Sequence, residues 1–380
     1  MKPRVLVDEN IPGAEAYLGN FAEITRAPGR QIAREQLLQA DALLVRSVTR
    51  VDAALLAGTP VRFVGTATSG FDHIDREWLA AQGIGFCHAP GSNANSVVEY
   101  LLAAIAENGD FLERLLAGAR IGIVGYGHIG QAVVRRLQHL AIDYCVCDPW
   151  LEAGAVPNCA SLDDVLACSV VSLHPSLVRA QPWPSYHLLG ASELAQLQSG
   201  QLLVNASRGP VVDNRDLLAR LQQPDAPAVV LDVWEPEPQL DPELLAGVDL
   251  GTAHIAGYSL DGKLLATGML ATALAQTLGL DVPAPRAPDP GPLFLAAPGS
   301  PADALRQLLA QRYRVADDDR RLRDAVLGAP AEQAARNFDL LRKHYPERRE
   351  LAGSVVNLDT GAESHAGLVR ALGAIPREAS

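Results

Sequence analysis

The feature that most restricts the fold of this chain is a glycine pattern between a short apolar run and a helical pattern. Arg120–Gly125 is typical of a buried strand and opens the sequence Gly125-Tyr126-Gly127-His128-Ile129-Gly130, which has the form G-x-G-x-x-G. An amphipathic segment, Ile129–Leu140, follows, and a second strand pattern, Tyr144–Cys147, ends at Asp148. A strand, a glycine turn, a helix and a second strand in this order predict a Rossmann-type dinucleotide-binding unit.

The residue types in this unit also indicate the cofactor. The three glycines permit a tight turn, a close approach of the backbone to a pyrophosphate, and packing of the helix on the strand. The backbone of His128 and Ile129 lies at the helix N-terminus, which offers N–H groups and a positive dipole end to phosphates. Asp148 is placed to accept hydrogen bonds from the adenosine ribose and to repel a 2′-phosphate. We therefore expect NAD rather than NADP; a glycine turn without a ligand is the alternative.

The rest of the chain predicts a second parallel sheet and more than one domain. With 380 residues, the chain is too long for one hydrophobic core, so two or three domains are expected. Near the N-terminus, strand patterns alternate with helical patterns, which predicts a doubly wound sheet with helices on both faces. These strands are Arg4–Val7, Ala42–Val45 and Val61–Gly65. One long helix, Ser96–Leu116, is expected to lead into the dinucleotide unit. The further strands of that unit are expected at Val170–Leu173, Leu202–Asn205, Val229–Val233 and Val248–Thr252.

The C-terminal part differs in composition from the rest of the chain. Five prolines crowd Pro283–Pro292, a segment that can be neither helix nor central strand, and we interpret it as a linker. The region beyond it is rich in charged residues, with helical patterns at Ala302–Arg312 and Ala331–Lys343. A strand at Gly353–Asn357 and a helix at His365–Leu372 would complete a small α+β domain.

The bulk composition excludes several classes of protein. A formal net charge of −12 argues against nucleic acid or an anionic membrane as the main partner. Leu264–Leu280 carries no charge, but it is short for a membrane span and contains Thr and Gln, so a buried helix is expected. The five cysteines lack C-x-x-C spacing and the N-terminus lacks a signal-peptide pattern. Both observations favour a cytoplasmic protein with reduced thiols and no metal site.

Four chemically useful side chains follow strands of the dinucleotide unit. Arg208 follows one strand, Glu235 and Glu237 follow the next, and His254 follows the last. Open α/β sheets bind ligands outside the carboxyl ends of their strands, so these side chains can converge on one place. Oxidation of a secondary alcohol needs a base, a carboxylate that orients the base, and a cation for an acidic substrate. We therefore expect His254 as the acid/base and Arg208 as the substrate clamp. The spacing does not separate Glu235 from Glu237 as the orienting carboxylate.

These segments resemble the D-isomer-specific 2-hydroxyacid dehydrogenases, over roughly Val5 to Leu280. The family pattern N-x-x-R-G, D-V-x-x-x-E-P and H-I matches Asn205–Gly209, Asp232–Pro238 and His254–Ile255. The resemblance implies NAD-dependent oxidation of a 2-hydroxy acid. It also implies a Rossmann-type NAD domain at 96–255, inserted into a flavodoxin-like substrate domain made of 1–95 and 256–283.

The same resemblance implies roles for individual residues. It assigns the orienting carboxylate to Glu237 and implies that Asp232 faces the nicotinamide carboxamide. Pro175 stands where the family usually has Thr, so a hydroxyl contact to the cofactor is lost there or passes to Ser176. The cofactor cleft would further be lined by Ala206, Ser207, Arg208 and Gly257.

A closer resemblance points to one branch of the family, whose members oxidise 4-phospho-D-erythronate in pyridoxal 5′-phosphate biosynthesis. The matching segments are Asp8–Pro12, Val45–Thr49, His254–Ser259 and Leu341–Pro346. The resemblance implies substrate contacts from Ser47, Thr68 and Tyr258, with Arg46 as a phosphate partner. The alternatives are turn-capping hydroxyls, a tyrosine at the edge of the core and a solvated arginine. It also implies that a C-terminal domain, 284–380, forms the contact of a homodimer.

Two other functions are compatible with the sequence. The chain could oxidise a different 2-hydroxy acid, such as 3-phosphoglycerate, although the extra domain pattern of serine-regulated phosphoglycerate enzymes is not visible. It could also be a non-enzymatic NAD-sensing corepressor, since such relatives can retain Arg208, Glu237 and His254.

Overall fold

The computed structural model describes residues 2–280 and 289–378. Contacts between Cα atoms divide the chain into two compact units. The first unit is made of Met1–Asn93 with Ser259–Pro288, and the second of Ala94–Tyr258 with Asp289–Ser380. Of the prolines interpreted as a linker, Pro283, Pro285 and Pro288 lie outside the described residues.

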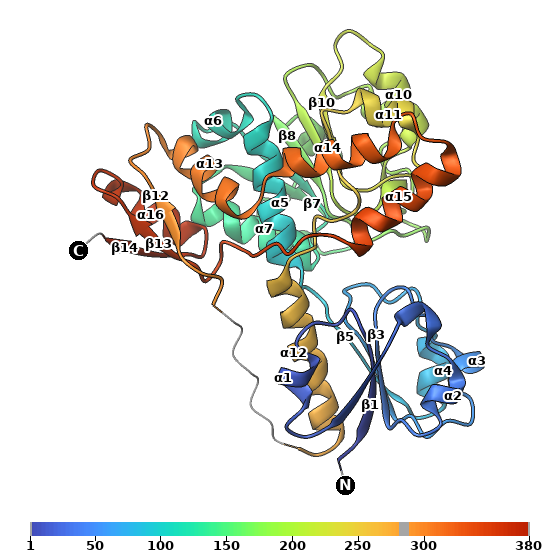
Figure 1. The fold of residues 1–380 in the computed structure, drawn as a ribbon. Helices are drawn as coiled ribbons and strands as arrows, with labels where there is room; N and C mark the ends of the chain where they lie inside the picture. Colours follow the sequence, from blue (N-terminus) through green and yellow to red (C-terminus); the bar gives the residue numbers. More distant parts are fainter. Residues whose placement is uncertain (1, 281–288, 379–380) are drawn as a thin grey trace. The chain divides into compact units, whose positions relative to one another are not determined.

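The first unit is built on a five-stranded parallel sheet in the order β2-β1-β3-β4-β5. Its strands are β1 (Arg4–Asp8), β2 (Glu23–Ala27), β3 (Ala42–Val45), β4 (Phe63–Thr66) and β5 (Gly85–His88). This is the flavodoxin-like order, as expected. One face is covered by α1 (Ala14–Leu18) and α12 (Leu260–Thr277), and the other by α2 (Arg34–Leu37), α3 (Ala53–Leu56) and α4 (Arg76–Ala81) (Figure 1).

Side chains of β1 show why this sheet needs a helical layer on each face. Val5 and Val7 pack in one cluster with residues of α1 and α12. Leu6 points the opposite way and packs with residues of α2, α3 and α4. Successive side chains of a strand point to opposite faces, so a strand that is apolar throughout must be buried on both. The uncharged segment expected as a buried helix is α12, with Leu264 and Leu270 in the first of these clusters.

The second unit contains a six-stranded parallel sheet in the order β11-β10-β9-β8-β6-β7. Its strands are β6 (Ile121–Val124), β7 (Tyr144–Cys147), β8 (Val170–Leu173), β9 (Leu202–Asn205), β10 (Ala228–Leu231) and β11 (Leu250–Gly251). One face packs with α5 (Ala94–Glu107), α6 (Phe111–Leu116) and α7 (His128–His139). The other packs with α8 (Leu162–Leu166), α9 (Ala191–Leu194), α10 (Asn214–Leu221) and α11 (Pro242–Gly247). The predicted second doubly wound sheet is confirmed.

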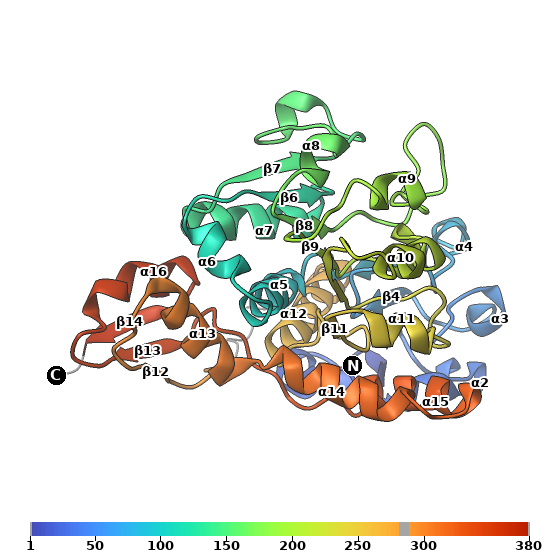
Figure 2. The ribbon, with the colours of Figure 1, turned by 90° about the horizontal axis from the view of Figure 1, so that it is seen from above.

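The C-terminal part adds a small parallel sheet in the order β12-β13-β14, together with further helices (Figure 2). The strands are β12 (Leu293–Leu295), β13 (Val355–Leu358) and β14 (Ile375–Glu378). The helices are α13 (Pro301–Arg312), α14 (Val315–Val326), α15 (Ala331–Lys343) and α16 (Ala366–Ala371). Short 3₁₀ turns lie at Gly29–Gln31, Ala153–Ala155, Gly209–Val211 and Glu363–His365.

This C-terminal part shares the hydrophobic clusters of the second unit. Leu305 and Leu308 of α13 pack in the cluster that contains α5 and α7. Leu322 of α14 and Phe338 of α15 pack in the cluster on the other face of the sheet. The structure therefore groups Asp289–Ser380 with the dinucleotide unit and not as a third unit.

One predicted helix is wrong. The single helix expected over Ser96–Leu116 is two helices, α5 and α6. Between them Gly109 adopts a φ of +48°, a left-handed conformation that ends a helix readily. The side chain of Asn108 donates to the carbonyl of Ala104 at 2.7 Å and so occupies a carbonyl that the ended helix leaves unpaired.

None of the helices within 2–280 and 289–378 combines the length and hydrophobicity that a membrane span requires. Over the same residues, no group of three or more His, Cys, Asp or Glu side chains is arranged to hold a metal ion.

A buried polar cluster ties the C-terminal part to α5. Glu99 of α5 is only 3% exposed, and its Oε1 accepts hydrogen bonds from the backbone N–H groups of Leu351 at 2.8 Å and Ala352 at 3.3 Å. The side-chain amide of Asn95 donates both to Glu99 at 2.9 Å and to Glu350 at 2.7 Å. Two carboxyl groups thus share one amide in the interior.

This cluster predicts a pH-dependent stability. Burial, and after it the charge of Glu350, raises the pKa of Glu99 from 4.5 to about 7. Between these values the unfolded chain has released a proton that the folded chain keeps, so folding loses stability as the pH rises. We expect Glu99→Gln to be more stable than the unchanged protein at about pH 8, by on the order of 2 kcal/mol, and the gain to shrink at about pH 5. Urea unfolding at both pH values measures the free energy of unfolding of the two proteins. If Glu99→Gln loses the same stability at both pH values, the raised pKa of Glu99 is contradicted.

Candidate active site

The carboxyl ends of the second sheet carry the predicted site residues. All pairs of neighbouring strands are parallel, so the loops that follow the strands meet at one edge. The strand order reverses between β6 and β8, and open α/β sheets bind ligands at such a point. Gly125 follows β6, Asp148 follows β7, Arg208 follows β9, Glu237 follows β10 and His254 follows β11.

The glycine turn after β6 has the shape that a pyrophosphate requires. A Cβ atom at Gly130 would lie 2.0 Å from the carbonyl oxygen of Gly125, so only glycine lets the helix start this close to the turn. A Cβ atom at Gly127 would meet nothing within 4 Å, which leaves its outer side open for a ligand. The helix α7 begins at His128, and the backbone N–H groups of its first turn, which includes Ile129, have no partners within the helix. The turn therefore fits a dinucleotide phosphate group.

Asp148 is held beside this turn. Its Oδ2 accepts the backbone N–H of Tyr126 at 2.8 Å, and its Oδ1 accepts that of Trp150 at 3.1 Å. A carboxylate fixed at the end of β7 can accept further hydrogen bonds from ribose hydroxyls, and its charge opposes a 2′-phosphate. This arrangement fits NAD.

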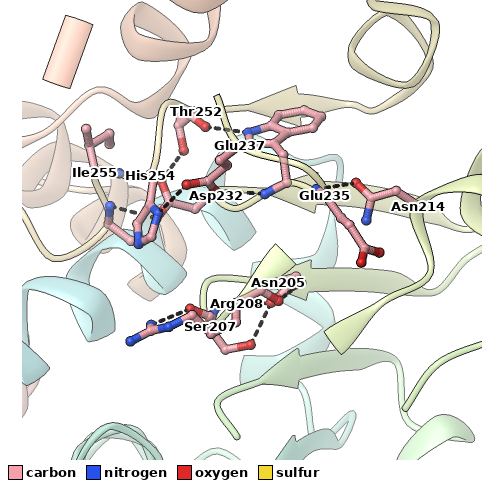
Figure 3. A network of polar contacts seen from close by, with 12 residues as sticks. Asn205, Ser207, Arg208, Asn214, Asp232, Glu235, Glu237, Thr252, His254 and Ile255 are labelled. Atoms are coloured by element: carbon pink, nitrogen blue, oxygen red, sulfur yellow. Dashed lines mark hydrogen bonds and ion pairs between the residues drawn. The ribbon is translucent and has the colours of Figure 1, made fainter. Parts of the chain in front are cut away.

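His254 and Glu237 form a hydrogen-bonded pair (Figure 3). His254 Nδ1 lies 2.8 Å from Glu237 Oε2, while Glu237 Oε1 accepts the backbone N–H of Trp234 at 3.0 Å. Burial alone would raise the pKa of Glu237, but the contact with His254, the Trp234 N–H and the charge of Arg342 outweigh it and lower that pKa. Because the carboxylate only accepts hydrogen bonds, Nδ1 of His254 is the donor, and in the neutral imidazole the lone pair is therefore on Nε2. Such an imidazole can act as a base.

Glu235, the other candidate carboxylate, has different partners. Its Oε2 lies 2.8 Å from Nε2 of His187, whose Nδ1 lies 3.1 Å from Asp213 Oδ2. Its backbone N–H donates to the side chain of Asn214 at 3.1 Å. The structure thus brings Glu237, and not Glu235, to His254. The cluster around His187 has no signal in the sequence, because its members are far apart in the chain.

Asp232 fixes the loop that carries His254. It is 1% exposed, and its Oδ1 accepts the Thr252 hydroxyl at 2.6 Å and the Ile255 N–H at 2.7 Å, while Oδ2 accepts the Ala256 N–H at 3.0 Å. Its carbonyl accepts the N–H of His254 at 2.7 Å. These contacts hold His254 at a φ of +55°, which few non-glycine residues adopt. The expected contact between Asp232 and the nicotinamide carboxamide of NAD remains a prediction.

Arg208 lies on the loop beside that of Glu237. A Cβ atom at Gly209 would lie 1.8 Å from the carbonyl oxygen of Trp234, so glycine is needed where the two loops touch. The guanidinium is exposed and one of its nitrogens donates to the carbonyl of Ser207 at 2.8 Å (Figure 3). Within 2–280 and 289–378, no hydrogen bond or ion pair joins Arg208 to the histidine–glutamate pair.

The other residues expected at the cofactor lie on the same loops. Ser207 is buried, and its N–H and hydroxyl both donate to the side chain of Asn205, at 3.1 and 2.8 Å. The half-buried ones are Pro175, Ala206 and Gly257. His174, just before Pro175, was not predicted as a site residue. Burial lowers its pKa to about 4, and its Nε2 lies 2.9 Å from the hydroxyl of Ser172, so it is a neutral side chain.

Three of the predicted substrate contacts lie in the first unit, after β3 and β4. Arg46 is half-buried and Ser47 is exposed. Thr68 donates from its hydroxyl to the carbonyl of Gly70 at 2.7 Å and shares a hydrogen bond with the hydroxyl of Thr66. Its hydroxyl therefore stabilises a turn, whatever else it binds.

The C-terminal part supplies contacts that sequence reasoning missed. The ring of Tyr258 meets that of Tyr345 edge-on, with 5.7 Å between their centroids. The guanidinium carbon of Arg342 lies 6.0 Å from the Tyr258 ring centroid, and Arg348 donates to the carbonyl of Ala256 at 2.7 Å. In the sequence, the segment with Arg342 and Tyr345 was identified only by its resemblance to the family, and no role was predicted for these two residues.

Two family models match the chain. The model described as the NAD-binding domain of D-isomer-specific 2-hydroxyacid dehydrogenases matches residues 98–256. A domain of unknown function, DUF3410, matches residues 295–373 and so covers most of the C-terminal part.

Curated relatives match nearly the whole chain. An erythronate-4-phosphate dehydrogenase of Cellvibrio japonicus is 45% identical, over 95% of this chain and 96% of the relative. An enzyme of the same name from Marinobacter nauticus is 44% identical, over 97% of this chain and 98% of the relative.

Solved structures share the fold of the two doubly wound sheets. A D-lactate dehydrogenase of Aquifex aeolicus, complexed with NAD and lactic acid, has a TM-score of 0.56 at 21% identity, over 72% of this chain and 96% of that one. An NAD⁺-bound 3-phosphoglycerate dehydrogenase of Entamoeba histolytica has a TM-score of 0.60 at 21% identity, over 73% of this chain and 96% of that one. At these identities the likeness shows the fold alone.

Proposed function

The chain belongs to the D-isomer-specific 2-hydroxyacid dehydrogenases, and we propose that within this family it oxidises the C2 hydroxyl of 4-phospho-D-erythronate. The product would be 2-oxo-3-hydroxy-4-phosphobutanoate, in a step of pyridoxal 5′-phosphate biosynthesis. The observation that carries the proposal is the identity of 45% to an erythronate-4-phosphate dehydrogenase, which extends over 95% of the chain. The cofactor is NAD.

The pair of His254 and Glu237 would perform the acid–base part of the reaction. Nε2 of His254 accepts the proton of the C2 hydroxyl, and Glu237, 2.8 Å from Nδ1, stabilises the imidazolium that forms. Bound NAD would supply the acceptor for the hydride, which leaves C2 with both electrons of the C–H bond. In the reverse direction the imidazolium returns the proton to the 2-oxo group.

The remaining predicted residues would bind the ligands. Arg208 binds the substrate carboxylate through two N–H groups of its planar guanidinium. The glycine turn and Asp148 hold the pyrophosphate and the adenosine ribose of NAD. Ser47, Thr68 and Tyr258 would contact the substrate, and Arg46 its phosphate group.

Steady-state oxidation of several 2-hydroxy acids with NAD tests this proposal. We expect kcat/KM for 4-phospho-D-erythronate to exceed that for unphosphorylated erythronate by about 100-fold or more, because erythronate would leave the phosphate-binding groups unpaired. The value for 3-phosphoglycerate should also be lower, since its phosphate lies one carbon closer to C2. Faster turnover of 3-phosphoglycerate would refute the substrate. Binding of NAD without oxidation of any hydroxy acid would favour the corepressor alternative.

We also propose that the protein is a homodimer joined through the C-terminal sheet. The register of β12, β13 and β14 places Phe294 and Ile375 on one face of this sheet, where they are 59% and 56% exposed. Together they form an apolar face that a second copy of the chain would cover. The double variant Phe294→Asp and Ile375→Asp is expected to have the mass of a monomer in light scattering, because charges there would be desolvated on association. Leu265→Asp, at a residue 54% exposed on α12, is the matched control and should remain dimeric. A dimeric double variant would contradict the proposal.

A further inference from the structure

The last residues of α15 and the chain that follows them run back past the first turn of α5 and contact the loop of His254 (Figure 1). We name residues Arg342–Glu350 the support segment and Ala253–Tyr258 the His254 loop. The two stretches lie far apart in the sequence, as Ala256 and Arg348 are 92 positions apart. The contacts between them belong to one compact unit.

Arg348 fixes the carbonyl group of Ala256, two residues after His254. Its side chain is buried, with a residue exposure of 5%, and one nitrogen donates to Ala256 at 2.7 Å and to the carbonyl of Ser96 at 3.1 Å. The same nitrogen contacts the hydroxyl of Ser96, which itself donates to Ala256 at 2.8 Å. The carbonyl of Ala256 therefore receives one donor from the support segment and one from α5. A buried charged donor with this geometry is costly to lose, because its partners stay buried without it.

The support segment also holds the far end of the loop. Tyr345 packs edge-on against Tyr258, and its hydroxyl donates to Asp318 of α14 at 2.7 Å, which fixes the Tyr345 ring. Arg342 lies over the Tyr258 ring, 6.0 Å from its centroid. The charge of Arg342 also helps to lower the pKa of Glu237, after the contacts of His254 and Trp234. Arg342 thus places a positive charge next to the tyrosine at the end of the His254 loop.

The His254 loop and the support segment also line one pocket together. This pocket has a volume of about 520 Å³ and is lined by Ala253 and Ile255, the two neighbours of His254, by Leu341 of α15 and by Tyr345 of the support segment. Space beside the loop lets it shift, since close packing does not oppose the movement there. The hydrogen bonds to Asp232 hold the loop from one side, and the polar contacts of the support segment add a second hold.

We propose that Arg348 and Arg342 are positioning residues for the oxidation, so that the C-terminal region completes the active site as well as carrying the proposed dimer contact. Arg348 holds the His254 loop in place, and Arg342 orients Tyr258 and places a positive charge beside that loop. The inference rests on the proposed function, in which His254 is the acid/base. It gives a chemical role to part of residues 295–373, which match a family model described only as a domain of unknown function.

Substitution of Arg348 in the full-length protein tests the role of the loop contact. We expect Arg348→Met to lower kcat about 100-fold, because small misplacements of a reacting group cost this much. The Kd for NADH should rise by much less than kcat falls, since the glycine turn is untouched and of the cofactor residues only Gly257 lies on this loop. The mass in light scattering should stay that of the unchanged protein. Arg348→Lys keeps the charge and one donor and should recover part of kcat. Arg336→Met, at an exposed residue of α15, is the control.

Substitution of Arg342 provides a second readout that a merely structural role would not move. Loss of its positive charge, which lies 6.0 Å from the Tyr258 ring in the His254 loop, favours the protonated imidazole. The acidic limb of the pH profile of kcat/KM should therefore move up by about 0.5 pH unit in Arg342→Met. Arg342→Lys retains the charge and should leave the limb in place. A limb that shifts equally in both variants would contradict the electrostatic role.

The outcomes separate this inference from the proposed function. If the unchanged protein oxidises a different 2-hydroxy acid, the substrate is refuted and the variants are compared on that acid instead. If folded Arg348→Met keeps kcat within about twofold of the unchanged protein, or loses activity only where the dimer dissociates, the positioning role is refuted. Should Arg348→Met fail to fold, the pair of Arg342 variants decides.

Discussion

In a His254→Asn variant, kcat for oxidation of the hydroxy acid is expected to fall about 1,000-fold or more, because asparagine cannot accept the hydroxyl proton. The loss corresponds to about 4 kcal/mol of transition-state stabilisation. Asparagine also preserves much of the volume and can still donate to Glu237, which lies 2.8 Å from Nδ1, so the loop of His254 should keep its conformation. Rapid-mixing measurements of NADH formation give kcat, and NADH binding measured in parallel shows whether the site keeps its conformation.

The control for this variant is His139→Asn, which changes an exposed histidine at the end of α7 and should leave kcat unchanged. The NADH affinity of His254→Asn should remain within about twofold, because the glycine turn and Asp148 are intact. A folded His254→Asn protein that retains more than about a tenth of kcat would exclude His254 as the acid/base.

The strands could be predicted from the sequence where they are buried, and were mostly missed where they are exposed at an edge. β8 and β9 have the bounds that the apolar runs indicated, because strands buried on both faces are almost continuously hydrophobic. The edge strands β7 and β11 are buried as well and were also predicted. The strands that were not predicted are β2, β5, β12 and β14, all at the edge of a sheet. β2 and β14 are largely exposed, so polar residues are accommodated there and hide the strand pattern.

The site could be predicted only as far as strand ends determine it. Parallel strands bring their carboxyl ends together, so the sequence placed Arg208, the two glutamates and His254 at one edge without any knowledge of contacts. It could not choose between Glu235 and Glu237, because the choice depends on His187, 48 positions away from Glu235. Arg348 was missed for the same reason. Spacing in the chain carries information about local geometry, whereas these partners are set by tertiary packing.

Substitution of Arg208 is expected to have the second largest effect. Arg208→Met should lower kcat/KM about 1,000-fold, since two charge-assisted hydrogen bonds to the substrate carboxylate are lost, each of about 2 kcal/mol. Arg208→Lys keeps the charge but not the planar pair of donors, and should lose about 10- to 100-fold. Because the guanidinium is exposed and bonded only to the Ser207 carbonyl among the described residues, both variants should fold and bind NADH normally.

A substrate analogue identifies the group that Arg208 binds. With the carboxylate of the hydroxy acid replaced by a primary amide, the unchanged protein should lose about as much kcat/KM as Arg208→Met loses on the acid. Arg208→Met should then lose little more on the amide, because the interaction is already absent. The two changes would be coupled, as expected of groups in direct contact. If the losses simply add, Arg208 acts elsewhere in the site, and the substrate carboxylate must be bound by a different cation.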